Sequence, residues 1–259
     1  MARRRFFVDE VRAGAEDEAR GGEDDVRGGR ASLAGEDARH LRQVLRAEPG
    51  QVYELSDNRS VYLAEIEAVS KDEVRFRILE RLPAPEPPLR LTLFLALIKF
   101  DRFEWAIEKV TELGVDAIVP VAAGRSEKGL ERAAVRRLER WRKIARESSQ
   151  QARRARLPEL AAPASFDRAL GASAGCRFFL DEDGGVPLLA ALPGERVPED
   201  RVCLLVGPEG GWTDGERESA ARAGWTIVSL GPAVLRAETA AVAAVAVLAS
   251  AWLRGPLVS

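Results

Sequence analysis

Apolar and polar residues alternate through residues 51–80, a pattern typical of β-strands with one buried face and one exposed face. Turn-forming residues at 56–59 separate the alternating runs, so we expect antiparallel strands that form a small β-barrel. Residues 3–8 predict an arginine-rich first strand. In residues 35–46 the apolar positions instead recur at helical spacing, which predicts a helix with its core face at Ala38, Leu41 and Val44 or Leu45.

The second part of the chain alternates strand patterns with helix patterns. Residues 91–98 are continuously apolar, as expected for a strand buried on both faces. A following apolar stripe predicts a helix that is capped by Asp101 and Glu104 and ended by Gly114. Further strands are expected at 115–121, 177–180, 202–206 and 225–230, and long helices at 131–154 and 237–253. This alternation predicts an α/β domain with a mostly parallel sheet.

A proline-rich segment separates these two patterns. We expect a first domain at residues 1–82, a stiff linker at 83–88 and a second domain at 89–259. Residues 13–30 mix glycine, acidic residues and arginine without any period, which indicates a mobile loop.

Two strands of the second domain run into glycine–proline loops. If the strands at 202–206 and 225–230 are parallel neighbours, both loops lie at the sheet edge where open α/β sheets bind ligands. Gly207, Gly210 and Gly211 lack a Cβ atom, so the backbone can approach a bound molecule closely. Either loop alone fits an ordinary turn, but the pair, with charged residues in both, favours a ligand site. Residues 181–185 could supply a third loop, and Thr213 with Glu216 has the spacing of a capping box.

Basic residues are concentrated locally, although the formal net charge of −2 argues against a nucleic-acid partner. Arg39, Arg42 and Arg46 recur at helical steps and form either a phosphate-binding face or a solvated face balanced by nearby acids. A second basic face is expected on the long helix at 131–154. It would contain Arg132, Arg136, Arg140, Lys143, Gln150 and Arg154, and its excess of positive charge favours an anionic partner.

The cysteine and histidine content excludes several kinds of site. Cys176 and Cys203 stand in apolar surroundings, which fits reduced thiols in the cytosol and offers no metal site. His40 is the only histidine and has no nearby partner for base catalysis, so we assign it at most an RNA contact. No secretory signal is expected, because the N-terminal arginines are followed by only a short apolar run and then by charged residues. No membrane span is expected either, because residues 237–253 are short and rich in alanine. We therefore expect a cytoplasmic protein with a buried C-terminal helix.

The two glycine loops carry a resemblance. Gly-Pro-Glu-Gly-Gly-Trp at 207–212 and Leu-Gly-Pro-Ala-Val-Leu-Arg-Ala-Glu-Thr-Ala at 230–240 are similar to the ribosomal RNA small subunit methyltransferase E family of the SPOUT superfamily. Shorter matches at 4–8, 40–46, 111–115 and 140–154 extend the resemblance over nearly the whole chain. It implies an N-terminal PUA-like RNA-binding barrel and a C-terminal SPOUT α/β domain with a trefoil knot.

The resemblance also implies an activity. The enzyme would bind S-adenosylmethionine, act as a homodimer, use no metal and methylate N3 of a uridine in 16S rRNA or the small ribosomal subunit. Arg236 would stabilise the developing uridine anion, while Glu238 or Glu209 would accept the proton or orient Arg236. The implied cofactor residues are Leu180, Val206, Gly207, Glu209, Gly210, Leu230, Gly231, Leu235, Arg236 and Thr239. The implied RNA-binding residues are Arg4, Arg5, Arg39, His40, Arg42, Arg46 and Arg154.

Three other functions stay open on the sequence. A nucleotide-binding oxidoreductase would be expected to show a Gly-x-Gly-x-x-Gly loop, which residues 207–211 do not match. An RNA-binding ribosome-assembly protein with a degenerate site is disfavoured by the intact loops. A SPOUT methyltransferase that acts on another RNA position would share the cofactor and differ in its product.

Overall fold

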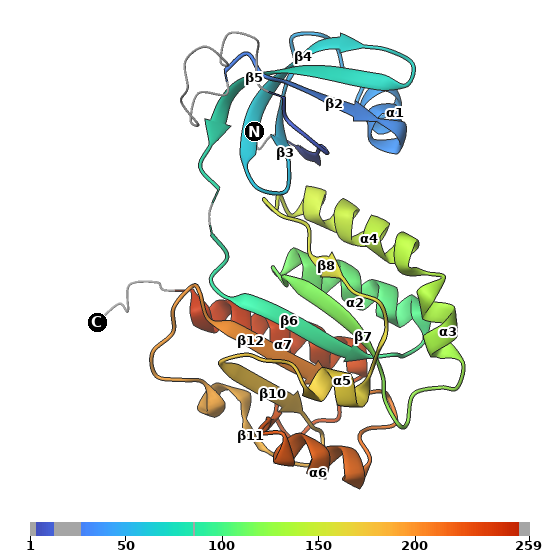
Figure 1. Ribbon diagram of the computed structural model, residues 1–259, viewed down its shortest axis with the longest axis vertical. Coiled ribbons are helices and arrows are strands. Elements are labelled where there is room, and N and C mark those ends of the chain that lie inside the picture. The colour runs from blue at the N-terminus through green and yellow to red at the C-terminus, as the bar shows by residue number, and fades with distance from the viewer. Residues whose placement is uncertain (1–3, 13–26, 85, 254–259) are drawn as a thin grey trace. The chain divides into compact units, whose positions relative to one another are not determined.

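The computed structural model describes residues 4–12, 27–84 and 86–253 of the 259-residue chain. The expected loop at 13–30 lies outside the described residues except for its last four positions. Contacts divide the chain into two compact units, each with its own hydrophobic core (Figure 1). The first unit joins Met1–Pro85 to Ser149–Leu157, and the second contains Glu86–Ser148 and Pro158–Ser259.

The first unit is built on a five-stranded sheet with the order β1-β3-β4-β5-β2. Its strands are β1 (Arg5–Phe7), β2 (Arg30–Ala34), β3 (Val52–Ser56), β4 (Val61–Val69) and β5 (Glu73–Leu82). All neighbours are antiparallel except β1 and β3. In β5 every second side chain is buried, through Val74, Phe76 and Ile78, which confirms the antiparallel strands that the alternating pattern predicted.

Helix α1 (Gly35–Gln43) buries Ala38 and Leu41 against this sheet, as predicted. The helix ends earlier than the apolar spacing indicated, because the amide of Ala47 donates back to the carbonyl of Leu41 at 3.0 Å. Arg46 lies in this turn with a φ of 51°. The prediction that Arg46 continues the helical stripe of Arg39 and Arg42 is therefore wrong.

A buried ion-pair network attaches the segment Ser149–Leu157 to the strands of the first unit. Glu54 on β3 accepts hydrogen bonds from Arg5 on β1, at 2.7 and 3.1 Å, and from Arg153. Arg5 also donates to the main-chain carbonyl of Arg153, and Arg5 is only 7% exposed. A hydrogen bond from Ser56 Oγ to the carbonyl of Ala155, at 2.6 Å, adds a second attachment point. Arg5 therefore stabilises the fold and is not an exposed basic residue.

The second unit contains an eight-stranded sheet with the order β11-β13-β10-β12-β6-β7-β8, and β9 pairs with β7. Its strands are β6 (Arg90–Ala96), β7 (Ala117–Ala122), β8 (Glu159–Leu160), β9 (Ala164–Ser165), β10 (Cys176–Leu180), β11 (Val186–Pro187), β12 (Arg201–Val206) and β13 (Thr226–Ser229). Every pair is parallel, which confirms the predicted sheet type. The two strands before the glycine loops, β12 and β13, are not neighbours, because β10 lies between them.

Helices cover both faces of this sheet. Along β12, Leu204 belongs to the core shared with helices α2, α4 and α7, whereas Leu205 belongs to the core shared with α5 and α6. Burial on both faces explains why the strands are continuously apolar. The helices are α2 (Phe100–Glu112), α3 (Leu130–Val135), α4 (Leu138–Gln151), α5 (Phe166–Leu170), the short 3-10 helix η1 (Leu188–Ala191), α6 (Asp214–Arg222) and α7 (Ala237–Trp252).

Two helix predictions for this unit need correction. Helix α2 begins after Lys99 without a side-chain cap, and Glu104 accepts hydrogen bonds from Arg137 and Arg140 instead of capping the helix. The long helix expected at 131–154 is two helices, because the amide of Arg137 donates to Ala134 in a tight turn between α3 and α4. Arg132 on α3 and Arg154 beyond α4 therefore do not share one continuous helix face. Gly114, with a φ of 99°, ends α2 as predicted.

Among the described helices, including the apolar α7, none is long and apolar enough to cross a membrane.

The thiol of Cys203 on β12 gives a test of this packing. Burial raises its pKa to about 11, and Arg177 opposes this shift only in part. The unfolded chain loses this proton at lower pH, near 9 or just below, so the free energy of unfolding should fall as pH rises from about 9 towards 11. Denaturant titrations of the wild-type protein and Cys203→Ala at pH 8 and pH 10.5 measure this difference. An equal loss of stability in both proteins would contradict the assignment.

Candidate cofactor pocket and active site

A pocket of about 550 Å³ lies in the second unit, where β10, β12 and β13 end. Because these strands are parallel, the loops that follow them meet at one edge of the sheet. The start of α7 completes the wall. The lining residues are Leu180, Asp181, Glu182, Val206, Gly207, Pro208, Glu209, Gly211, Trp212, Leu230, Gly231, Ala233, Leu235, Ala237 and Ala240.

The structure brings most of the predicted cofactor residues together in this pocket. The lining includes Leu180, Val206, Gly207, Glu209, Leu230, Gly231 and Leu235, but not Gly210, Arg236 or Thr239. Apart from Leu180, sequence reasoning did not assign the lining residues that lie outside the two predicted glycine loops. Asp181 and Glu182 belong to the third loop that the sequence suggested. Ala237 and Ala240 lie on the side of α7 that faces the pocket, and the sequence of a helix that is apolar all round does not show which side that is.

Trp212 lines the pocket and links the end of β10 to the loop after β12. Its ring is 1% exposed and packs against Phe179, with 4.6 Å between ring centroids. Its Nε1 donates to the carbonyl of Leu180 at 2.9 Å. A Cβ atom on Gly207 would lie 2.9 Å from the indole, so only glycine lets this loop lie against the ring. The glycine predicted for close backbone approach is thus required by the protein's own packing.

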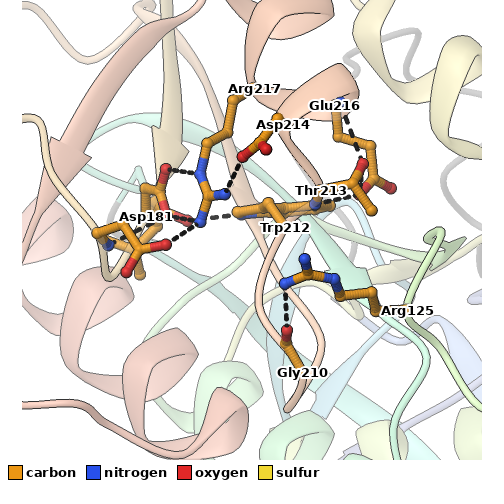
Figure 2. A network of polar contacts seen from close by, with 10 residues as sticks. Arg125, Asp181, Gly210, Trp212, Thr213, Asp214, Glu216 and Arg217 are labelled. Atoms are coloured by element: carbon orange, nitrogen blue, oxygen red, sulfur yellow. Dashed lines mark hydrogen bonds and ion pairs between the residues drawn. The ribbon is translucent and has the colours of Figure 1, made fainter.

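The loop that follows β7 also holds the glycine loop after β12, through polar contacts (Figure 2). Arg125 Nη1 donates to the carbonyl of Gly210 at 2.9 Å. Thr213 and Glu216 form the predicted capping box at the start of α6. The second oxygen of Glu216 accepts the amide of Gly124 at 2.7 Å, so the cap also fixes the loop that carries Arg125.

The loop after β10 is held by Arg217 of α6 (Figure 2). Arg217 donates to both carboxylate oxygens of the buried Asp181, at 2.7 and 3.1 Å, and pairs with Asp183 and Asp214. The hydrogen bond to Asp181, together with the charges of these carboxylates, raises the pKa of Arg217 above its ordinary value. Asp181 therefore lines the pocket with its charge already compensated.

Both catalytic candidates stand at the N-terminus of α7. Arg236 is exposed, occupies the N-cap position between two lining residues and makes no side-chain ion pair with the described residues. Glu238 lies in the first helical turn and is only 7% exposed. Its Oε2 atom is buried without a hydrogen-bond partner among the described residues. The positive end of the helix dipole favours a carboxylate here.

Arg102 of α2 connects Glu238 to the glycine loop. It forms an ion pair with Glu209, and its Nε lies 3.8 Å from Glu238 Oε1. Sequence reasoning missed Arg102, because it stands 107 positions from Glu209 and no motif marks it.

The predicted RNA-binding residues all belong to the first unit. Arg4, Arg39, His40 and Arg46 are exposed, and Arg4 Nη1 lies 3.2 Å from the Nε2 atom of His40. Arg42 and Arg154 are half-buried. Arg5 is buried in the Glu54 network and is not available to a ligand without breaking that network.

Within the part of the chain that the structure describes, no group of three His, Cys, Asp or Glu side chains could hold a metal ion.

Comparison with known proteins identifies the chain. The model of an RNA methyltransferase domain matches residues 85–249, and that of an RNA methyltransferase PUA domain matches residues 33–79. The fold and the site thus define an RNA methyltransferase with an N-terminal PUA domain.

Relatives specify this class further. Ribosomal RNA small subunit methyltransferase E of Bacillus subtilis is 32% identical over 81% of this chain and 85% of its own length. The Mycobacterium bovis protein of the same name is 34% identical over 86% and 88%. The crystal structure of the Neisseria gonorrhoeae enzyme, bound to S-adenosylmethionine, has a TM-score of 0.82 and 29% identity over 97% and 98% of the two chains. The chain belongs to the ribosomal RNA small subunit methyltransferase E family.

Gly207→Ala tests the packing of the pocket. The added Cβ must displace the indole of Trp212, so we expect at least a tenfold loss of S-adenosylmethionine affinity and a changed tryptophan emission. Isothermal titration calorimetry and fluorescence measure the two effects. Gly215→Ala is the matched control, because no atom of the described residues lies within 4 Å of its Cβ position and alanine suits helix α6. Unchanged affinity in Gly207→Ala would show that Trp212 does not shape the pocket.

Proposed function

We propose that this protein uses S-adenosylmethionine to methylate N3 of a specific uridine in 16S rRNA. The observation that carries the proposal is the pocket at the ends of three parallel strands, formed by the loops that match the family and flanked by Arg236 and Glu238. The identity of the target base and its N3 position extend beyond the family assignment and are part of the proposal.

The pocket fits S-adenosylmethionine in its chemistry. Leu180, Val206 and Leu230 offer apolar surface for an adenine ring. The lining carboxylate of Glu182 forms no ion pair with the described residues, which suits a cationic cofactor. The Neisseria relative that binds this cofactor has the same fold over nearly its full length. Bound S-adenosylmethionine supplies an electrophilic methyl group.

The protein must make the uridine nitrogen nucleophilic. N3 carries a proton that has to leave as the new C–N bond forms, and negative charge develops on the uracil oxygens. We assign Arg236 to these oxygens, because its exposed guanidinium has no ion-pair partner among the described residues and stands beside the pocket. We assign Glu238 as proton acceptor in preference to Glu209, because its Oε2 is unpartnered while Glu209 is paired closely with Arg102.

The first unit would supply RNA affinity. Its PUA-type domain presents the exposed Arg4, Arg39, His40 and Arg46, whose charges can contact phosphates. The substrate is either 16S rRNA or the assembled small subunit. The target base must leave its stack to reach a pocket.

Three further features of the family resemblance stay predictions for this chain: the trefoil knot, a homodimer and a cytoplasmic location. A second copy could cover Val234 and Leu235, which are large, exposed apolar side chains beside the pocket.

The first experiment is incubation of the purified protein with labelled S-adenosylmethionine and small ribosomal subunits that lack the modification, followed by nucleoside mass spectrometry. We expect 3-methyluridine at one position. Methyl on a ribose or another base would retain the cofactor and contradict the proposed product. Failure to bind the cofactor would contradict the methyltransferase proposal itself.

Arg236→Ala tests the anion-stabilising role. Loss of a charged donor in the transition state should lower kcat by about 100-fold or more, with unchanged thermal unfolding, because the side chain has no partner in the described fold. Arg222→Ala is the matched control, since Arg222 is an exposed arginine of the same unit on α6. Single-turnover methylation assays compare them. Wild-type turnover in Arg236→Ala would remove Arg236 from the mechanism.

The double variant Arg39→Ala/Arg46→Ala tests the RNA-binding face. We expect weaker RNA binding and a salt dependence of log Kd that is shallower by about one to two phosphate contacts. Cofactor affinity should not change, because both residues lie in the first unit. Filter binding at several salt concentrations measures the effect, with the exposed Arg75→Ala on β5 as control. If the salt dependence of log Kd is equal in all proteins, Arg39 and Arg46 do not contact RNA phosphates.

A further inference from the structure

Arg102 occupies an unusual position, because one guanidinium lies at ion-pair distance from two carboxylates that come from different elements. Glu209 comes from the loop after β12, and Glu238 comes from the first turn of α7. Within the described residues, Arg102 is the only cation at ion-pair distance from either carboxylate. The adjacent Phe103 is fully buried in the core, and α2 packs along α7, so the base of the arginine side chain is held firmly.

The three side chains differ in what they need from one another. Glu238 is buried, its Oε2 has no partner among the described residues, and its Oε1 is 3.8 Å from Arg102 Nε. A buried carboxylate that loses its counter-ion is strongly destabilised or changes position. Glu209 is more exposed, lines the pocket and makes the closer contact with Arg102. Movement of Arg102 would therefore change both the pocket wall and the environment of Glu238.

We propose that Arg102 is a positioning residue that couples the glycine loop to Glu238. Through Glu209 it holds the loop against the pocket, and through Glu238 it fixes the carboxylate that accepts the uridine proton. This inference rests on the proposed function, because it assigns cofactor affinity to one ion pair and turnover to the other. Arg102 contacts neither reacting atom and acts only through the two glutamates.

Arg102→Met removes the charge and keeps a side chain of similar length. We expect cofactor affinity to fall about tenfold and kcat to fall about 100-fold, because a hydrogen bond or ion pair to a charged group has an effect of this order. Arg102→Lys retains the charge but lacks the planar fork that reaches two carboxylates. It should keep most of the cofactor affinity through Glu209 and recover only part of kcat.

Double-mutant cycles separate the two pairs. If Arg102 acts through Glu209 on binding, Arg102→Met/Glu209→Gln should bind S-adenosylmethionine no more weakly than Arg102→Met. If it acts through Glu238 on turnover, Arg102→Met/Glu238→Gln should turn over no more slowly than Glu238→Gln. Calorimetry gives the affinities, and single-turnover methylation gives the rates.

Arg137→Met is the matched control, because Arg137 also pairs with a glutamate of α2, Glu104. Its affinity and rate should stay within about twofold of wild type, as expected for a partly exposed pair.

Several results would overturn the coupling role. Additive effects in both cycles would do so, as would wild-type affinity and turnover in Arg102→Met. If Arg102→Met does not fold, full activity in Arg102→Lys would show that the residue only supports the fold. A wild-type protein that binds no S-adenosylmethionine would instead contradict the proposed function.

Discussion

Parallel alignment of β10, β12 and β13 is the constraint that creates the site. In a parallel sheet all carboxyl ends lie at one edge, so the loops that follow these three strands meet there. The same alignment sends the chain from β13 into α7, whose first turn closes the pocket. A hydrophobic sheet covered on both faces supplies the rigidity, while the loops supply the chemistry.

Charged side chains from distant elements hold these loops in place. Arg217 binds the carboxylate after β10, Arg125 binds a carbonyl of the loop after β12, and Arg102 binds Glu209 of that same loop. Each arginine donates to a defined acceptor in a loop that forms part of the pocket. The wall is therefore set by hydrogen bonds to fixed groups rather than by loop sequence alone, and its carboxylates are largely compensated before any ligand binds.

The first unit uses the same device for another purpose. Buried Glu54 binds Arg5 and Arg153, and this network attaches Ser149–Leu157 to strands that lie about one hundred positions earlier. The first unit therefore contains a segment from the second half of the sequence, in addition to its N-terminal residues. Arg5 is buried in this network, so the exposed arginines of the unit remain as the candidates for RNA contacts.

Local patterns were sufficient for the elements that depend on local interactions. The alternation at 51–80, the apolar run of β6, the capping box at Thr213 and the end of α2 at Gly114 all follow from neighbouring residues, and the structure confirms them. The glycine loops also carried the family resemblance. These features were readable because backbone conformation and burial on one face are set within a few positions.

Long-range contacts decided the remainder. Three features depend on residues that are far apart in the chain. They are the position of β10 between β12 and β13, the burial of Arg5, and the pairing of Arg102 with Glu209 and Glu238. The break between α3 and α4 likewise could not be read from a continuous helical pattern. An arginine looks the same in the sequence whether it faces solvent, RNA or a buried carboxylate, and its partner is chosen only when the sheet and helices bring the two together.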